Sequence, residues 1–204
     1  MDLKGKKVLV FGAGKSGIGA ADLLGSVGAQ PIIYDGNENL DKEAVLHKTN
    51  GTYTPEIWAG AFPEGEMESL DLVVLSPGVP TDLPLVKSFY EKGLPVWSEV
   101  ELAYRTGKGE VLAITGTNGK TTTTALLGKI MGDARESVFV VGNIGTAYTS
   151  KSLEMREDSV TVAEISSFQL ETIEQFRPKV SAILNITEDH LNRHHTMEEY
   201  IRVK

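Results

Sequence analysis

The sequence predicts an α/β protein built on parallel sheets. Short β-branched runs alternate with helix-like segments along all 204 residues, and this alternation is typical of strands joined by crossover helices. The expected strands are almost continuously apolar, as in sheets that helices cover on both faces. The elements form two series, from which we expect one domain over residues 1–98 and a second over residues 99–204.

The first series contains four expected strands and three expected helices. Strands are expected over residues 7–11, 31–34, 70–75 and 95–97. Helices are expected over residues 15–27, 41–49 and 83–92. Gly28 and Gly93 follow two of these helices, where a residue without Cβ adopts the left-handed, helix-ending conformation at little cost. Residues 50–69 give the weakest pattern.

The second series begins after a polar segment at residues 106–109. Its strands are expected over residues 110–115, 138–141, 159–165 and 180–186. A helix over residues 99–105 leads into it, and another is expected over residues 122–130. Thr196 and Glu199 form a capping-box pattern that predicts a helix from Met197 onwards. Because no closing strand or helix-stop signal precedes Lys204, we expect the chain to be truncated.

Composition and charge exclude several classes of protein. Lys and Arg number 20 against 28 Asp and Glu, so the formal net charge is -8 and no basic nucleic-acid-binding surface extends over the whole chain. The absence of cysteine excludes disulfides, thiolate nucleophiles and cysteine metal sites, and it fits a reducing compartment. No apolar run approaches the roughly 18 residues of a membrane span. We therefore expect a cytoplasmic protein.

A glycine-rich turn, GAGKSG at residues 12–17, follows the first expected strand and opens a helix. This is the context of a dinucleotide-binding fingerprint. Its first two glycines permit a tight turn and a close backbone approach, and the amides at the helix N-terminus favour phosphate oxygens. Asp35 ends the next strand, where a carboxylate can bind a ribose diol. Taken alone, the motif favours NAD; a turn that binds nothing is the alternative.

A second glycine-rich turn, TGTNGKT ending at Thr121, follows a buried-type strand and precedes a helix. It predicts a phosphate loop, in which backbone amides surround phosphates, Lys120 neutralises the β and γ groups and Thr121 holds magnesium. The full pattern has glycine where Ile114 stands, so only Gly116, Gly119, Lys120 and Thr121 fit, in a compressed form. ATP is the expected ligand, and a turn without a ligand is the alternative.

Three polar residues are expected near this second turn. Glu164 ends an apolar strand, and an acidic residue at such a place beside a phosphate loop commonly binds magnesium. The alternative is that Glu164 binds nothing and only precedes an ordinary capped helix. His190 follows the next strand, but magnesium prefers oxygen ligands, so the residues alone leave a ligand role and a structural role equally open. Asn143 follows a third strand and either meets a substrate or forms a turn.

Together these motifs resemble the Mur ligase family over the entire chain. The resemblance rests on GAGKSG at 12–17, SPGV at 76–79, GTNGKTT at 116–122, GNIG at 142–145, EISSFQLE at 164–171 and NITEDH at 185–190. It implies a Rossmann-like N-terminal domain that binds the uridine diphosphate of the substrate, without a nicotinamide, and a partial P-loop central domain. It also implies an ATP-dependent ligase of peptidoglycan synthesis that joins D-glutamate to UDP-N-acetylmuramoyl-L-alanine through an acyl phosphate.

The resemblance assigns roles to residues by position. The implied substrate residues are Gly14, Lys15, Ser16, Gly17, Asp35, Ser76, Gly78 and Asn143. The implied ATP-binding residues are Gly116, Thr117, Asn118, Gly119, Lys120, Thr121 and Thr122. Thr121, Glu164 and His190 are the implied Mg²⁺ ligands, and Lys120, His190 and Lys204 the implied catalytic residues. Lys204 stands where the family carries a lysine carbamate, but we expect an unmodified amine, because this residue would end a frayed helix.

The family also has a further half of the central domain and a C-terminal domain, which these 204 residues lack. We therefore expect this chain to bind nucleotide without ligating, and its second domain to expose sheet edges and apolar surface. Two other functions stay open. One is a nicotinamide-dependent oxidoreductase whose second glycine turn is incidental, and the other is an inactive nucleotide-binding module.

Overall fold

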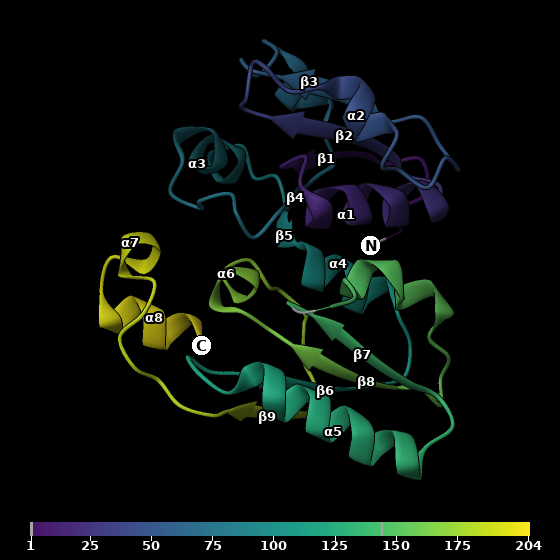
Figure 1. Ribbon diagram of the computed structural model, residues 1–204. Helices are drawn as coiled ribbons and strands as arrows, with labels where there is room; N and C mark the ends of the chain where they lie inside the picture. Colours follow the sequence, from purple (N-terminus) through teal and green to yellow (C-terminus); the bar gives the residue numbers. More distant parts are fainter. Residues whose placement is uncertain (1, 144) are drawn as a thin grey trace. The chain divides into compact units, whose positions relative to one another are not determined.

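The structure is a computed structural model that describes residues 2–143 and 145–204. The chain divides into two compact units, Met1–Leu102 and Ala103–Lys204. Each unit is built on one all-parallel sheet, and helix α4 (Glu99–Thr106) carries the chain from the first to the second (Figure 1). The predicted α/β class with parallel sheets is confirmed.

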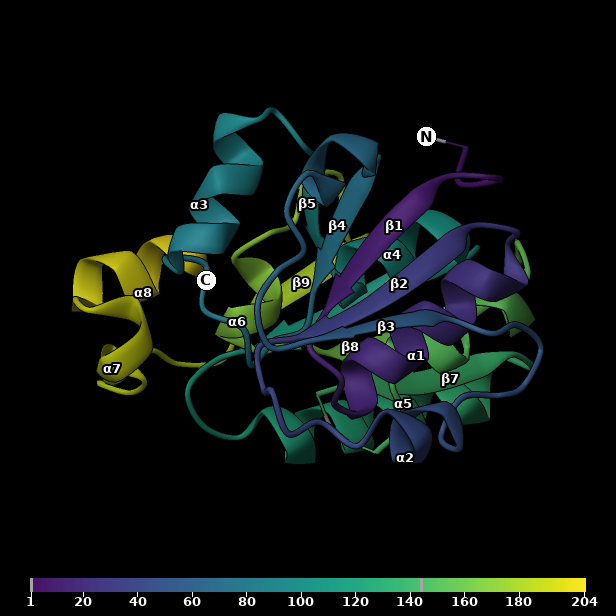
Figure 2. The ribbon, with the colours of Figure 1, turned by 90° about the horizontal axis from the view of Figure 1, so that it is seen from above.

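In its described residues, the first unit contains five strands, three α-helices and one 3₁₀ helix before α4. They are β1 (Lys7–Phe11), α1 (Lys15–Ser26), β2 (Gln30–Asp35), α2 (Lys42–Leu46), β3 (Glu56–Ala59), the 3₁₀ helix η1 (Glu66–Ser69), β4 (Leu72–Leu75), α3 (Pro84–Glu91) and β5 (Val96–Ser98). The strand order is β3-β2-β1-β4-β5, and Figure 2 shows β1 between β2 and β4. The order reverses at β1, and ligands of open parallel sheets bind outside the carboxyl ends of strands at such a reversal.

Alternation along the strands of this sheet builds a core on each face. Val8 and Val10 of β1 are fully buried on the face that α1 covers, together with Leu24 of α1. Leu9, also on β1, faces the other side and shares a core with Phe89 of α3. Because both faces are covered, the strands are apolar throughout, as the sequence pattern predicts.

The described part of the second unit contains four strands and a long helix that follows the first of them. Its elements are β6 (Glu110–Thr115), α5 (Lys120–Ala134), β7 (Val138–Gly142), the 3₁₀ helices η2 (Tyr148–Ser150) and η3 (Ser152–Glu154), β8 (Val160–Glu164), α6 (Ser167–Leu170), β9 (Val180–Ile183), α7 (Leu191–His194) and α8 (Met197–Val203). The strand order is β7-β8-β6-β9. Helix α5 packs along β6, β7 and β8 (Figure 1), and the turn after β6 lies between the carboxyl ends of two neighbouring strands.

The second unit exposes apolar side chains. Val180 and Ile183 on the edge strand β9 are 57% and 51% exposed, and Leu126 and Ile130 of α5 are 60% and 53% exposed. The expectation of an open sheet edge and uncovered apolar surface is confirmed. Within the described residues, no helix combines the length and apolar character needed to cross a membrane.

The structure differs from the sequence prediction mainly at short elements and element ends. Strand β3 lies within the weakly patterned residues 50–69 and was missed, because only Trp58 of its four residues is buried. Helix α2 ends at Leu46 rather than at residue 49, and α5 runs over Lys120–Ala134 rather than 122–130. Strand β9 ends at Ile183 rather than at residue 186, because Asn185 turns its side chain to the backbone of Asn118.

Candidate functional site

The first glycine-rich turn is closely packed against the end of β4. A Cβ on Gly17 would lie 1.8 Å from the carbonyl oxygen of Gly12 and 2.8 Å from Ser76 Oγ. The Ser76 hydroxyl donates to the Gly12 carbonyl at 3.3 Å. Only glycine fits at positions 12 and 17, so these two residues are a packing requirement of the strand-to-helix turn as well as part of a ligand signature.

The outer side of this turn is open. Gly14 precedes α1 and has no atom within 4 Å of where a Cβ would stand. No side chain caps α1 and no acidic residue lies in its first turn, so the helix N-terminus offers amides to an anion. Lys15 and Ser16 are the first two residues of α1; Lys15 is exposed and Ser16 is half-buried. Gly78 is exposed in the loop after β4.

Asp35 supports the turn at the end of β2. One carboxylate oxygen accepts a hydrogen bond from the amide of Ala13 at 3.0 Å, and the other accepts from the amide of Asn37 at 3.0 Å. The carboxylate therefore holds the glycine turn in shape, and each oxygen keeps a lone pair for a further donor such as a ligand hydroxyl.

The second glycine-rich turn has the form of a phosphate loop. Gly116 and Gly119 take positive φ values of 141° and 83°, and α5 begins directly after Gly119 without a side-chain cap or an acid in its first turn. The Lys120 ammonium donates to the carbonyls of Gly116 and Thr117, both at 2.9 Å. The positive charge thus lies over the loop, next to the open amides at the start of α5, where a phosphate would be held.

Three of the predicted residues meet at the carboxyl edge of the second sheet. Glu164 ends β8 and is 1% exposed. The Thr121 hydroxyl donates to its Oε2 at 2.9 Å, and the Asn143 amide donates to its Oε1 at 3.0 Å. Gly142 allows this approach, because a Cβ there would lie 2.1 Å from the Glu164 carbonyl oxygen. Ile144, the next residue of that motif, lies outside the described residues.

The phosphate loop is fixed to the segment that follows β9. The Thr117 hydroxyl accepts from the amide of Thr187 at 3.0 Å and lies 2.9 Å from the hydroxyl of Tyr200. Asn185 accepts from the Asn118 amide at 2.9 Å and donates to the Asn118 carbonyl at 3.0 Å. Tyr200 is only 1% exposed, so these bonds tie the loop to a buried part of α8.

Lys204 also reaches the phosphate loop. Its ammonium donates to Thr115 Oγ1 at 3.0 Å and to the Gly116 carbonyl at 2.9 Å. Burial, with a smaller effect from the nearby charge of Lys120, lowers the pKa of Lys204 to about 8. The expectation that Lys204 lies on a frayed helix is therefore wrong, since its side chain is anchored on the loop. Whether the amine is modified stays a prediction.

His190 sits in a different environment. It has left-handed backbone, with φ 54°, directly before α7. Its ring packs on Phe168 with centroids 4.8 Å apart, and its Nε2 lies 3.4 Å from Asp189 Oδ2. The side chain is 46% exposed. Among the described residues, no hydrogen bond or ion pair joins His190 to Glu164 or Thr121, so the structure brings together only two of the three predicted Mg²⁺ ligands.

The oxygen-rich edge fits magnesium better than it fits a softer metal. Magnesium binds proteins through one or two carboxylates together with substrate phosphates and water, and Glu164 and Thr121 supply a carboxylate and a hydroxyl beside the phosphate loop. Over residues 2–143 and 145–204, no group of three or more His, Cys, Asp or Glu side chains forms a ready-made metal site. The residues thus fit a metal held jointly with a phosphate.

A buried polar cluster next to His190 was missed in the sequence. Arg193 donates to both carboxylate oxygens of Glu171 at 3.0 and 3.2 Å, and their side chains are 10% and 8% exposed. His194 lies 2.9 Å from Ser167 Oγ and 3.4 Å from Glu171. Burial lowers the pKa of His194. The residues of this cluster lie in short helices or directly after one, and such short helices leave no periodic pattern to detect.

These observations define a two-unit α/β protein in which each unit presents an uncapped glycine turn at the carboxyl edge of a parallel sheet. Two family models match the chain: the MurD-like N-terminal domain of Mur ligases over residues 6–98 and the Mur ligase middle domain over residues 114–204. The chain belongs to the Mur ligase family.

Curated relatives agree with this assignment. The chain is 61% identical over 204 residues to UDP-N-acetylmuramoylalanine--D-glutamate ligase of Lachnospira eligens and 48% identical over 205 aligned residues to the protein of the same name from Clostridioides difficile. Both alignments cover 100% of this chain and 45% of the relative. The chain thus spans a little under half the length of the curated relatives that it matches.

Solved structures support the fold. The UDP-N-acetylmuramate:L-alanyl-gamma-D-glutamyl-meso-diaminopimelate ligase from Neisseria meningitides aligns with a TM-score of 0.56 at 17% identity, over 97% of this chain and 66% of that one. The UDP-N-acetylmuramate-alanine ligase MurC from Thermotoga maritima aligns with a TM-score of 0.51 at 24% identity, over 97% of this chain and 46% of that one. At these identities the likeness concerns the fold alone.

Proposed function

We propose that this chain is part of an ATP-dependent ligase of peptidoglycan synthesis that joins D-glutamate to UDP-N-acetylmuramoyl-L-alanine. The observation that carries the proposal is the contact of Thr121 and Asn143 with the buried Glu164 beside an open phosphate loop. The names of the curated relatives give the reaction and its substrates. The absence of cysteine supports a reducing, cytoplasmic setting.

The proposed reaction has two steps. A substrate carboxylate oxygen attacks the γ-phosphorus of ATP, which gives an acyl phosphate and releases ADP. The amine of D-glutamate then attacks the acyl carbon, and phosphate and a proton leave as the amide forms. Because a carboxylate must approach a polyphosphate, positive charge and alignment are the main demands on the protein.

The described residues meet these demands on the ATP side. The amides at the start of α5 and the Lys120 ammonium lie on the loop, where they would neutralise and orient the β- and γ-phosphates. Glu164 and Thr121 would hold magnesium, and the ion would supply further charge neutralisation at the phosphate oxygens. Asn143 fixes the Glu164 carboxylate from the other side, and its position suits contact with the muramoyl-alanine end of the substrate.

The first turn is proposed to bind the uridine diphosphate of the substrate. Gly14 and the start of α1 offer open amides to the pyrophosphate, and Lys15, Ser16, Ser76 and Gly78 surround that end of the sheet. Asp35 keeps free lone pairs at the end of β2, where a nucleoside hydroxyl would reach it.

Calorimetry on the 204-residue chain tests this proposal with three ligands: UDP, ATP with Mg²⁺, and NADH. We expect heat of binding with UDP and with ATP, because both turns present open amides. Lys120→Ala should abolish the ATP signal and leave the UDP signal, and Lys129→Ala, on the exposed side of the same helix, should change neither. Heat with NADH and none with UDP would favour the nicotinamide-dependent alternative.

In the full-length enzyme, Lys120→Ala should lower turnover by at least roughly a hundredfold, as the loss of one preorganised electrostatic group does. The reason is that the Lys120 ammonium donates to the loop carbonyls of Gly116 and Thr117, next to the amides that would hold the phosphates. A steady-state assay of phosphate release checks this expectation. Turnover close to that of the unaltered enzyme would remove Lys120 from the mechanism.

A further inference from the structure

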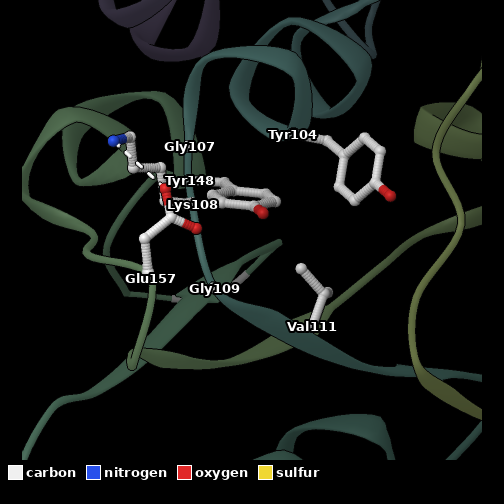
Figure 3. Close-up of a pocket in the computed structure, with 7 residues that line it drawn as sticks. All are labelled: Tyr104, Gly107, Lys108, Gly109, Val111, Tyr148 and Glu157. Carbon is white, nitrogen blue, oxygen red and sulfur yellow. Dashed lines mark ion pairs between the residues drawn. The ribbon is translucent and has the colours of Figure 1, made fainter.

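A pocket in the second unit lies apart from the phosphate loop. Its volume is about 390 Å³, and it is lined by Tyr104, Gly107, Lys108, Gly109, Val111, Tyr148 and Glu157 (Figure 3). The pocket surrounds the beginning of β6, whereas the phosphate loop follows the end of that strand. At about 3.3 Å per residue, β6 separates the two by roughly 15 to 20 Å. The volume is within the range of small-molecule sites.

The pocket contains the phenol of one largely buried tyrosine. Tyr148 is 3% exposed as a whole residue, and its phenol, which lines the pocket, makes no hydrogen bond to the described part of the chain. Figure 3 shows the hydroxyl end of Tyr148 directed toward the space between Tyr104 and Val111. The hydroxyl therefore opens into the pocket, where it can donate a hydrogen bond to an acceptor on a ligand.

The protonation state of this phenol decides what it can bind. Burial, together with the neighbouring Tyr104, holds the pKa of Tyr148 well above its ordinary value. The phenol is therefore neutral at physiological pH and serves as a hydrogen-bond donor. A carbonyl oxygen is the complementary group.

The wall opposite Tyr148 is aromatic and fixed. The Tyr104 ring packs edge-on against Phe176, with centroids 5.3 Å apart and an interplanar angle of 80°. Its hydroxyl donates to the carbonyl of Arg177 at 3.2 Å. Tyr104 and Val111 thus offer a preformed apolar surface, and an aromatic ring gains edge or stacking contacts on such a surface.

The charged residues of the pocket neutralise each other. Lys108 and Glu157 form an ion pair at 3.2 Å, and their side chains are 60% and 83% exposed. Figure 3 shows this pair on the side of Tyr148 away from Tyr104. The pocket therefore offers no unpaired charge to an ionic ligand among the residues that line it.

We propose that this pocket binds an uncharged aromatic ring that carries a carboxamide or ring carbonyl, with the carbonyl oxygen accepting from the Tyr148 hydroxyl and the ring against Tyr104 and Val111. The site is separate from the proposed nucleotide sites and does not depend on their function. A single aromatic heterocycle or benzamide fits the volume with room for a substituent.

Nuclear magnetic resonance titration of the 204-residue chain with benzamide tests the proposal. We expect saturable shifts at the amides of Gly107, Gly109 and Val111, and a dissociation constant below about 10 mM, since a small fragment binds weakly. Cyclohexanecarboxamide keeps the carbonyl without the aromatic ring and should bind several-fold more weakly. Saturating ATP with Mg²⁺ should leave the benzamide affinity unchanged, whether or not ATP itself binds.

Tyr148→Phe is the decisive variant, because it keeps the ring and removes only the hydroxyl. It should weaken benzamide binding about fivefold to tenfold, the effect of one hydrogen bond. Tyr53→Phe is the matched control: it removes a tyrosine hydroxyl from a residue of the first unit that does not line the pocket, and its loss should leave binding unchanged. Absence of saturable shifts at the pocket, or equal affinity in Tyr148→Phe, would overturn the proposal.

Discussion

At the scale of single residues, the phosphate loop is held by side chains outside its own motif. Thr117 is the central contact, since its hydroxyl meets both the Thr187 backbone and the Tyr200 hydroxyl. Thr117 and Tyr200 are buried, and an unpaired hydroxyl is costly in such a place whereas a satisfied one fixes geometry. The shape of the loop therefore depends on α8, the last helix of the chain.

Tyr200→Phe removes the hydroxyl that contacts Thr117. It should destabilise the attachment of the loop to α8 by about 1 kcal/mol, the net contribution of one buried hydrogen bond. Hydrogen exchange at the amides of Thr117 and Thr187 measures it, and we expect about fivefold faster exchange. Tyr148→Phe, in the same unit and similarly buried, removes a hydroxyl that makes no hydrogen bond to the residues the structure describes, and it should leave these amides unchanged. Equal exchange in both variants would show that the hydroxyl of Tyr200 does not hold the loop.

His194 is a second residue whose environment sets a measurable property. Burial lowers its pKa, opposed by Glu171 and Glu199 and assisted by Arg193 and His190. The folded state therefore binds this proton less readily than the unfolded state, whose histidine titrates near 6.5. It follows that stability is retained above about pH 6.5 and falls as the pH drops below it.

The prediction is a loss of stability between about pH 7 and pH 5 that His194→Gln reduces, since an amide can still reach Ser167 but carries no titrating proton. Urea unfolding followed by circular dichroism measures the free energy of unfolding at each pH. His47→Gln, at the exposed end of α2, should keep the full slope. If the His194→Gln variant shows the same fall in the free energy of unfolding with pH, the imidazole of His194 is not the cause of that fall.

Sequence reasoning reached the site residues to different degrees. Thr121, Glu164 and Asn143 could be predicted to meet, because each follows the end of a parallel strand and such ends share one edge. His190 could not be placed beside them, because its position depends on a left-handed turn before α7. Tyr200 gave no signal, since a buried tyrosine in a short amphipathic helix looks like an ordinary core residue.

At the scale of elements, strand ends and helix starts carry the proposed chemistry. Helices α1 and α5 both begin after a glycine, without a capping side chain and without an acid in the first turn. Uncapped helix starts leave several amides without partners, and an anion satisfies them. Long strands and helices were predicted well because their apolar pattern repeats, whereas β3, α6 and α7 have four residues each, too few for a period to appear.

Strand β9 exposes apolar side chains at the edge of the second sheet. Its Val180 and Ile183 are exposed on the sheet edge, and apolar edge strands promote association. We expect the 204-residue chain to associate at high concentration and Val180→Lys with Ile183→Lys to reduce that association. Sedimentation velocity measures it. The control is Leu153→Lys, which removes a similarly exposed apolar side chain from η3. If Leu153→Lys reduces association as much as the β9 variant does, β9 is not the specific cause of association.

At the scale of the whole molecule, the two units repeat one physical arrangement with different glycine turns. In each, a central strand ends in a turn that only glycine can form, and a helix start faces outward from it. The α/β class could be predicted from the composition and from the alternation of strand-like and helix-like segments. The family resemblance could be stated from six short sequence motifs. Contacts between residues far apart in sequence, such as Lys204 with Gly116, could not be predicted from either.

The central claim is that this one chain holds two separate phosphate-binding turns. Amide mapping by nuclear magnetic resonance, with ATP and Mg²⁺ in one titration and UDP in another, tests it most directly. We expect ATP to shift the amides of residues 116–122 and UDP to shift those of residues 12–17, each without disturbing the other set. Shifts at neither turn, or both ligands competing for a single turn, would contradict the claim.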